Sequence, residues 1–285
     1  MASLYAERVG AEICSPFVDA AGVLHVVSQA TGDVLAISGE GATAVLNTGG
    51  QPAAVAPSPA TGALYVADLA HSAVLSVDAD EAGSGAYGKP SVVVRVYEDK
   101  AFKGPSALCF DSKEPDSLYF TDSGALGETG LHAPRGSLYY IAHAPGGGGQ
   151  MLRPLALECL AHPCGLCVSP DGARVYVAEM MTNRVLCYVQ RPAGVFHGSV
   201  FAQLGGSIGP SCLACDAAGN VYVGLYGLAS AGAGAAGRVA IFGPDGRALG
   251  EIAVPAPEIT GLCLSGTGQL FITEASTGSV YAASV

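Results

Sequence analysis

The cysteines are the first residues whose type and spacing suggest chemistry, and the 285-residue chain contains 9 of them. Two Cys-x-x-Cys motifs, Cys164/Cys167 and Cys212/Cys215, have the spacing of a zinc-binding pair. Both lie in short apolar segments that predict β-strands, in which residues three apart face opposite sides of the sheet. Because such a pair needs a bulge to hold one ion, we expect these thiols to pack in the core, as small buried cysteines commonly do.

His162 and Cys164 form a second candidate arrangement, in which a nucleophile lies beside a base. They are two residues apart, so both project from the same side of a strand. A thiolate nucleophile requires a base or a cationic neighbour. The alternative is that both side chains simply fill a narrow pore. The net charge of −11 favours this alternative, because negative surroundings raise the pKa of a thiol.

Carboxylates supply a third candidate chemistry, general acid–base catalysis. Asp122 and Glu179 each end a strand of alternating aliphatic and aromatic residues, and Glu258 directly precedes the apolar strand "ITGLCLS". Glu258 together with Asp122 and Glu179 is therefore a candidate catalytic set. For Asp122 and Glu179 we favour a structural role instead, because acidic side chains at strand ends commonly accept hydrogen bonds from nearby backbone.

A repeated unit determines how these residues are positioned. It consists of a short apolar strand, a turn containing Gly or Asp, and a strand of aliphatic–aromatic–aliphatic pattern. The second strands of its six copies begin at Leu24, Leu64, Leu118, Val175, Val221 and Leu270. A period of roughly 40–50 residues is typical of β-propellers. The sequence predicts an all-β six-bladed β-propeller with four antiparallel strands per blade, a single domain over residues 1–285, and an N-terminal strand at Ser3–Val9 that closes the last blade.

The start of each inner strand faces the central channel of a propeller, and the second strands end on the same face. Alignment of the turns places six small side chains at the channel, namely Cys14, Ala53, Ser106, Cys164, Ser211 and Thr260. In this register Glu258 lies before the last inner strand. A shift of two residues would turn it inward, because side chains alternate with a period of two.

Blades three to five also resemble a known group of propellers. The segments "GPSALCFDSKEPDSLYFTDSG", "RGSLYYI" and "HPCGLCVSPDGARVYVAEMMTNRVLCYV" are similar to the strictosidine synthase-like and gluconolactonase (regucalcin-like, NHL-type) superfamily over about residues 104–225. In the metal-dependent lactonases of that superfamily, carboxylate and Asn side chains at the channel hold a divalent cation. The resemblance places the corresponding Glu, Asn and Asp at Cys14, Cys164 and Ser211. None of these residues matches, so we predict no metal and no cofactor here.

The overall composition limits which binding partners and which cellular compartment we expect. The charge of −11 and the absence of a basic run argue against nucleic acid and against an anionic membrane surface. The N-terminal residues lack the apolar core of a signal peptide, and no apolar stretch reaches about 18 residues. With an odd number of cysteines and no sign of export, we expect reduced thiols and a cytoplasmic location.

Two functions remain open at this point. We favour a catalytically degenerate propeller that acts as a binding or scaffold module for a protein partner or a small-molecule ligand at the channel face. Its candidate binding residues are Cys14, Ser106, Cys164, Ser211, Thr260, Asp122 and Glu179. The alternative is an enzyme, a hydrolase or lactonase of the superfamily with a relocated active site, for which Cys164, His162 and Glu258 are the catalytic candidates.

Overall fold

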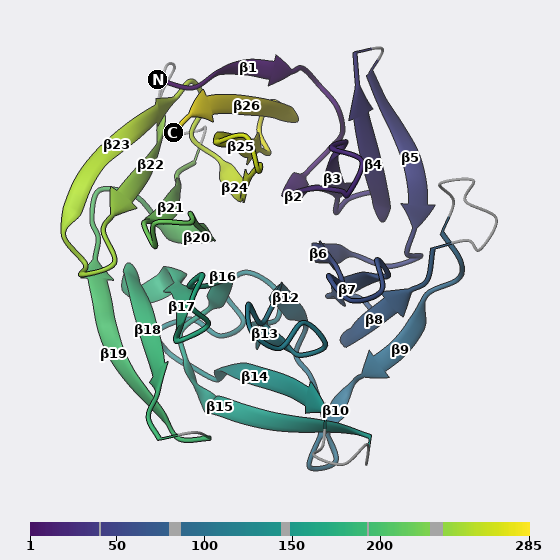
Figure 1. The fold of residues 1–285 in the computed structure, drawn as a ribbon, viewed down its shortest axis with the longest axis vertical. Coiled ribbons are helices and arrows are strands. Elements are labelled where there is room, and N and C mark those ends of the chain that lie inside the picture. Colours follow the sequence, from purple (N-terminus) through teal and green to yellow (C-terminus); the bar gives the residue numbers. More distant parts are fainter. Residues whose placement is uncertain (40, 80–86, 144–148, 193, 229–235) are drawn as a thin grey trace.

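Six four-stranded antiparallel sheets stand around a central axis in the computed structural model (Figure 1). The model describes residues 1–39, 41–79, 87–143, 149–192, 194–228 and 236–285. Each sheet is one blade. In five blades the strands follow chain order from the channel outward, and in the last blade the N-terminal strand is added as the outermost. This arrangement confirms the predicted all-β six-bladed propeller.

The strand bounds show how regular the blades are. Blades one to three comprise β2 (Ile13–Val18), β3 (Leu24–Ser28), β4 (Asp33–Ser38) and β5 (Gly41–Asn47); β6 (Pro52–Pro57), β7 (Leu64–Asp68), β8 (Ala73–Val77) and β9 (Ser91–Val94); and β12 (Pro105–Phe110), β13 (Leu118–Asp122), β14 (Gly136–His143) and β15 (Gln150–Leu160). Between blades two and three lies a small hairpin of β10 (Val96–Tyr97) and β11 (Lys100–Ala101).

Blades four to six repeat the pattern. They comprise β16 (Pro163–Val168), β17 (Arg174–Glu179), β18 (Arg184–Gln190) and β19 (Phe196–Gln203); β20 (Gly209–Cys215), β21 (Val221–Tyr226), β22 (Gly237–Phe242) and β23 (Ala248–Val254); and β24 (Ile259–Leu264), β25 (Gln269–Glu274), β26 (Ser279–Ser284) and β1 (Ser3–Ala6). A single turn of 3₁₀-helix, η1 (Met180–Thr182), follows β17. None of the helices in the described segments is long and apolar enough to span a membrane.

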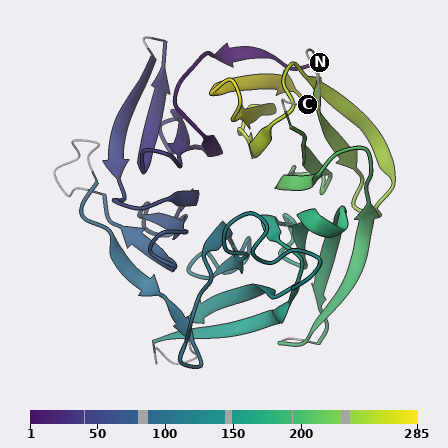
Figure 2. The ribbon, with the colours of Figure 1, turned by 180° about the vertical axis from the view of Figure 1, so that it is seen from behind.

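The N-terminal strand β1 closes the ring as the outer strand of the last blade. It pairs antiparallel with β26, with Ser3 opposite Ala282 and Leu4 opposite Tyr281. The Tyr5 ring packs edge-on against Phe271, with 4.9 Å between centroids. Both termini therefore lie in the same sheet, side by side in the view from behind (Figure 2).

The hydrophobic core lies between blades. Each of the six buried clusters found among the described residues draws on two adjacent sheets. One cluster, for example, joins Val27 of blade one to Val66 of blade two, and both side chains are fully buried. Because the strands alternate, every blade buries one face against each neighbour. The channel wall is therefore held rigidly from outside.

The turn after the inner strand explains the recurrent Asp and aromatic residues of the repeat. In blade five, Asp216 Oδ1 accepts hydrogen bonds from the backbone N–H groups of Ala218 and Asn220, which fixes the turn. The Tyr222 hydroxyl of the next strand donates to Asp216 Oδ2 at 3.2 Å. In blade three, Asp111 and Tyr119 form the same pair at 3.1 Å. The turn thereby sets the register of the two innermost strands.

Candidate functional site

A ring of small side chains surrounds the channel where the inner strands begin. In five of the six blades, the ring residue lies at an irregularity in the pairing of the inner strand with the second strand, as Ser106 does between Pro105 and Ala107. Such bulges re-aim one side chain without ending the strand. The ring consists of the six residues expected from the turn alignment, Cys14, Ala53, Ser106, Cys164, Ser211 and Thr260, and all of them line one cavity.

The polar members of this ring connect one blade to the next. Ser106 Oγ donates to the carbonyl oxygen of Pro163 at 2.9 Å, and Ser211 Oγ donates to that of Ile259 at 2.6 Å. The thiols do the same more weakly, since Cys14 Sγ lies 3.3 Å from the Ala53 carbonyl oxygen and Cys164 Sγ lies 3.4 Å from that of Pro210. Thr260 Oγ1 completes the circle by donating to Ile13 of the first blade at 2.6 Å. The Ala53 side chain has no hydroxyl or thiol group that could donate a hydrogen bond, so blade two lacks this contact with blade three.

Above the ring the channel widens into a cavity of about 440 Å³, called here the channel-mouth cavity. A second layer of six residues, at or directly after the ends of the second strands, lines it: Gln29, Leu69, Ser123, Met180, Tyr226 and Ala275. A third layer lies two residues before the ring in blades one, four and six, and consists of Glu12, His162 and Glu258. Backbone hydrogen bonds join the layers. For example, the Met180 N–H donates to the His162 carbonyl oxygen at 3.1 Å.

Two members of the third layer have unusual backbone conformations. Glu12 and His162 have φ angles of 48° and 56°, in the left-handed region that non-glycine residues rarely adopt. Backbone of this kind clusters at functional sites when the surrounding structure holds it in place. These residues lie just before the regular inner strands, and their side chains also line the cavity, as does Glu258 two positions before Thr260.

His162 is the most deeply buried ionisable group of the cavity, with 6% of its surface exposed. Burial lowers its pKa from 6.5 to about 4, so the imidazole is neutral at physiological pH. Its Nδ1 atom is buried without a hydrogen-bond partner among the described residues. A buried polar atom left unpaired is costly and uncommon, which makes His162 a candidate to contact a ligand.

Glu258 and Tyr226 form the polar centre on the other side. The Glu258 backbone N–H donates to Glu274 Oε1 at 3.0 Å, which fixes the start of β24. Burial, and then the charge and hydrogen bonding of Glu258, raise the pKa of Tyr226. Tyr226 therefore keeps its proton, and its hydroxyl group donates a hydrogen bond to the Glu258 carboxylate. Glu12 and Glu274 contribute smaller effects of the same sign, so this side of the cavity is acidic.

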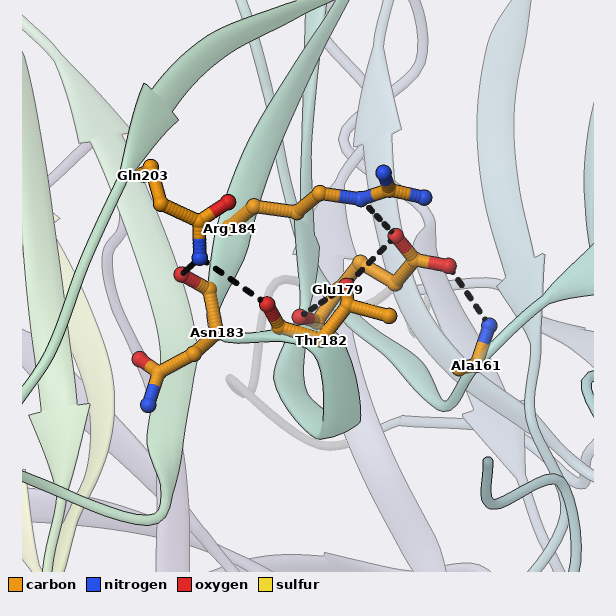
Figure 3. Close-up of polar contacts among 6 residues, drawn as sticks. All are labelled: Ala161, Glu179, Thr182, Asn183, Arg184 and Gln203. Carbon is orange, nitrogen blue, oxygen red and sulfur yellow. Dashed lines mark hydrogen bonds and ion pairs between the residues drawn. The ribbon is translucent and has the colours of Figure 1, made fainter. Parts of the chain in front are cut away.

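Asp122 and Glu179 lie outside the channel-mouth cavity. Asp122 accepts the backbone N–H groups of Lys103 and Gly104 at 3.1 and 2.7 Å, and burial raises its pKa. Glu179 Oε1 accepts the N–H of Ala161 at 2.7 Å, while Oε2 accepts Thr182 Oγ1 and forms an ion pair with Arg184 (Figure 3). Both carboxylates hold the loop that precedes an inner strand, as the structural interpretation expected.

The Cys164/His162 pair does not form a nucleophile and base. The Cys164 thiol is directed at the carbonyl oxygens of Pro210 and Ala178, at 3.4 and 3.9 Å. Burial, reinforced by Cys212, raises the pKa of Cys164, and burial also raises that of Cys14 to about 12. Protonated thiols that donate to backbone are poor nucleophiles. Of the catalytic candidates, His162 and Glu258 keep the stronger geometric case.

The ring does not fit a divalent cation either. Hard cations require several oxygen ligands with net negative charge, whereas the ring contains no carboxylate and its hydroxyl groups donate to backbone. In the described part of the chain, no group of three or more His, Cys, Asp or Glu side chains is placed to hold a metal ion.

A larger cavity of about 570 Å³ occupies the other end of the channel. It shares Ala53, Ser106, Cys164 and Thr260 of the ring, but its remaining lining comes mostly from apolar inner-strand residues. Its carboxylate, Asp111, is already engaged by the Lys113 N–H and the Tyr119 hydroxyl. Carboxylate and imidazole side chains that are not committed to turns therefore gather at the channel mouth.

Among the site residues that sequence reasoning missed are Glu12, Gln29 and Tyr226. One signal was available: Glu12 precedes Cys14 by two residues, as His162 precedes Cys164 and Glu258 precedes Thr260. No signal in the sequence pointed to Tyr226, because blade five carries Leu225 at the position where four of the other five blades have an acid.

Residues 39–276 match the model of the SMP-30/gluconolactonase/LRE-like region. The chain belongs to this family. It is 31% identical over 142 residues to the L-arabinolactonase of Azospirillum brasilense, covering 47% of this chain and 45% of that protein. It is 28% identical over 233 residues to the gluconolactonase of Zymomonas mobilis subsp. mobilis, covering 75% and 58%. The chain thus spans about half the length of these curated relatives.

Solved structures of the family show the same fold. A gluconolactonase from Xanthomonas campestris superposes with a TM-score of 0.76 at 22% identity, covering 99% of this chain and 89% of that one. The calcium-binding protein regucalcin from Agrobacterium tumefaciens superposes with a TM-score of 0.72 at 18% identity, covering 97% and 90%. At this identity the likeness concerns the fold alone, and it agrees with the resemblance drawn from the sequence.

The expectation of a catalytically degenerate binding or scaffold module is wrong. The family match and the lactonase relatives favour the alternative, a hydrolase or lactonase of the superfamily. The error has a physical origin. The absence of metal ligands from the ring was taken as the loss of all polar chemistry, whereas the layers above the ring retain Glu12, His162 and Glu258.

Proposed function

We propose that this protein is a lactonase that hydrolyses a cyclic ester in the channel-mouth cavity. The observation that carries the proposal is the meeting of Glu258, Tyr226 and a neutral His162 around one cavity. Membership of a family whose curated relatives include lactonases supports the reaction class. A cavity of about 440 Å³ suits a small-molecule substrate.

The proposed chemistry uses a carboxylate as a general base. Glu258 removes a proton from a water molecule while the water oxygen attacks the lactone carbonyl carbon. The ring C–O bond then breaks, and the ring oxygen takes the proton back from Glu258 to give a hydroxy acid. Tyr226 orients the carboxylate through its hydroxyl group, and Glu274 holds the Glu258 backbone at 3.0 Å.

His162 directly precedes the inner strand of blade four and lines the same cavity. In the proposal its N–H donates to the carbonyl oxygen as negative charge develops there, because a neutral imidazole is both donor and acceptor. The negative charge of the site also favours release of the product. A lactone is neutral, whereas its product is a carboxylate that Glu12 and Glu258 repel.

The test is hydrolysis of a panel of γ- and δ-lactones, followed as acid release in weakly buffered solution. We expect Glu258→Gln to lower kcat by about 10²–10⁴-fold, the usual contribution of a general base. Glu251→Gln is the matched control, because Glu251 is exposed on β23 and pairs with Arg238 away from the cavity. The absence of hydrolysis of any lactone by the folded protein, or full activity of Glu258→Gln, would overturn the proposal.

A further inference from the structure

The two sides of the channel-mouth cavity differ in polarity. Blades five, six and one contribute Tyr226, Glu258, Glu12 and Gln29. Blades two, three and four contribute Leu69, Leu126 and Met180, which we call the apolar arc. In Figure 1 these two sets of blades occupy the upper and lower halves of the ring. A ligand in the cavity therefore meets carboxylates on one side, whereas on the other side it meets these aliphatic side chains together with His162.

The serine hydroxyl groups near the apolar arc already donate hydrogen bonds to main-chain carbonyl oxygens. Ser106 Oγ donates to the Pro163 carbonyl oxygen at 2.9 Å, and Ser123 Oγ donates to that of Gly124 at 2.9 Å. The Cys164 thiol donates to Pro210 in the same way. Apart from His162, which the proposed function assigns to the lactone carbonyl oxygen, these side chains have no free hydrogen left to donate to the hydroxyl groups of a polyhydroxylated lactone, and poorly paired buried hydroxyl groups weaken binding.

Leu126 is the member of the arc that a ligand would cover most. It stands on the loop between β13 and β14 and is 62% exposed although it lines the cavity. Single exposed leucines are ordinary on protein surfaces. What distinguishes Leu126 is that Leu69 and Met180, from the neighbouring blades, line the same cavity, and Met180 is 6% exposed. Together the three side chains give this side of the cavity an apolar wall.

We propose that the substrate is a lactone bearing an uncharged alkyl or aryl substituent, which packs against Leu69, Leu126 and Met180. The inference rests on the proposed lactonase function and adds the substrate class to it. The lactone ring lies toward Glu258 and Tyr226, and the substituent extends across the channel. A charged substituent is disfavoured, because an anion would meet Glu12 and Glu258, and a cation placed on the apolar arc would lose its hydration without gaining a partner.

The first experiment compares kcat/KM for unsubstituted δ-valerolactone, a δ-lactone carrying a five-carbon alkyl chain, and glucono-δ-lactone. We expect the alkyl lactone to be the best substrate. Leu126→Ser should lower its kcat/KM by about 10-fold, since one or a few methylenes in an apolar site contribute discrimination of this size. The same variant should lower kcat/KM for δ-valerolactone much less than for the alkyl lactone, because δ-valerolactone has no substituent to pack against the arc.

Leu131→Ser is the matched control. Leu131 lies on the same loop and is 69% exposed, but it does not line the cavity among the described residues. It should leave kcat/KM for all three lactones unchanged. Equal effects of Leu126→Ser and Leu131→Ser on the alkyl lactone, or faster hydrolysis of glucono-δ-lactone than of the alkyl lactone, would overturn the substrate class while leaving a lactonase.

A second measurement separates this inference from the reaction itself. The δ-lactam with the same alkyl chain resists hydrolysis, so its binding by calorimetry reports the arc alone. We expect micromolar to millimolar binding that Leu126→Ser weakens about 10-fold. If the lactam binds in this way and no lactone is hydrolysed, the lactonase proposal fails and the apolar ligand preference stands. If the lactam does not bind, the apolar arc has no such role.

Discussion

Thr260 donates its hydroxyl hydrogen to the main-chain carbonyl of Ile13, 2.6 Å away, and so joins the inner strand of the last blade to that of the first. The two residues are 247 positions apart in the chain. Equivalent contacts link blades three to four, four to five and five to six, and a thiol links blade one to blade two. The small residues of the channel ring therefore hold neighbouring blades together, which explains why they carry hydroxyl or thiol groups.

Ala53→Ser should stabilise the protein by supplying the missing contact between blades two and three. The new hydroxyl would face the carbonyl oxygen of Pro105, as Ser106 faces that of Pro163. We expect the free energy of unfolding to rise by about 0.5–1.5 kcal/mol, the net contribution of one hydrogen bond. Urea unfolding measures it. Ala54→Ser is the control, and it should destabilise the protein because Ala54 is 8% exposed in the core.

Deletion of residues 1–9 should destabilise the fold by a few kcal/mol. It removes β1 from β26 and also breaks the Val9 N–H to Gly278 contact of 2.8 Å, and each such bond contributes about 0.5–1.5 kcal/mol. The unpaired edge of β26 would also become open to association. Thermal unfolding and limited proteolysis test this prediction. Removal of Met1 alone, which is 90% exposed, should change neither, and a nine-residue deletion as resistant as the full chain would contradict ring closure by β1.

The repeat was predictable from sequence because it depends on local rules. The second strand of blade two was expected to begin at Leu64, and β7 begins there. The six ring residues were also predictable, because the Asp-containing turns fix the register of each inner strand. The closing strand was predictable from the number of strands, because the sequence has one strand more than the first blade needs and one fewer than the last blade needs.

The third layer of the cavity was not predictable by the same means. The turn alignment placed Glu258 before the last inner strand, and β24 does begin one residue later, at Ile259. Glu258 nevertheless lines the cavity, because residues just outside the regular strand also reach it. His162 lies in a left-handed conformation, with φ of 56°, that no sequence rule for a non-glycine residue anticipates. The polar chemistry of the site lies in these irregular residues.

Cys159 should be the most reactive thiol toward iodoacetamide in the folded protein at pH 8, and Cys164 should be unreactive. Cys159 is exposed, whereas burial raises the pKa of Cys164 and its Sγ donates to Pro210. Peptide mapping after brief labelling identifies the modified residue, and Cys159→Ser should abolish the fast phase. His162→Ala should not change labelling of Cys164. Selective alkylation of Cys164 at pH 6 would restore the nucleophile interpretation.

Addition of Ca²⁺, Mg²⁺ or Zn²⁺ should leave the melting temperature unchanged. The expectation follows from the donor chemistry of the ring, in which no carboxylate is present and the hydroxyl groups donate to backbone. An ion that bound only the folded state at about 100 times its dissociation constant would add about 2.7 kcal/mol. Lactone hydrolysis should likewise persist in excess EDTA. A metal-dependent rise in melting temperature would show that a cation site exists.

His162 should make the protein less stable as the pH falls from about 6.5 to about 4. Burial lowers its folded-state pKa from 6.5 to about 4, so within this window the unfolded chain binds a proton that the folded chain excludes. The contribution of His162 is therefore complete above pH 6.5 and is lost on acidification, by about 3 kcal/mol at most, since one pKa unit corresponds to about 1.4 kcal/mol. Urea unfolding of wild type and His162→Gln at several pH values isolates it from the carboxylates that titrate in the same range. The stability difference between the two proteins should change with pH in this window, whereas His132→Gln, which alters an exposed residue, should run parallel to wild type. Parallel curves for His162→Gln would mean that the imidazole is charged or solvated in the folded protein, and its proposed role as a neutral donor in the cavity would fall with that result.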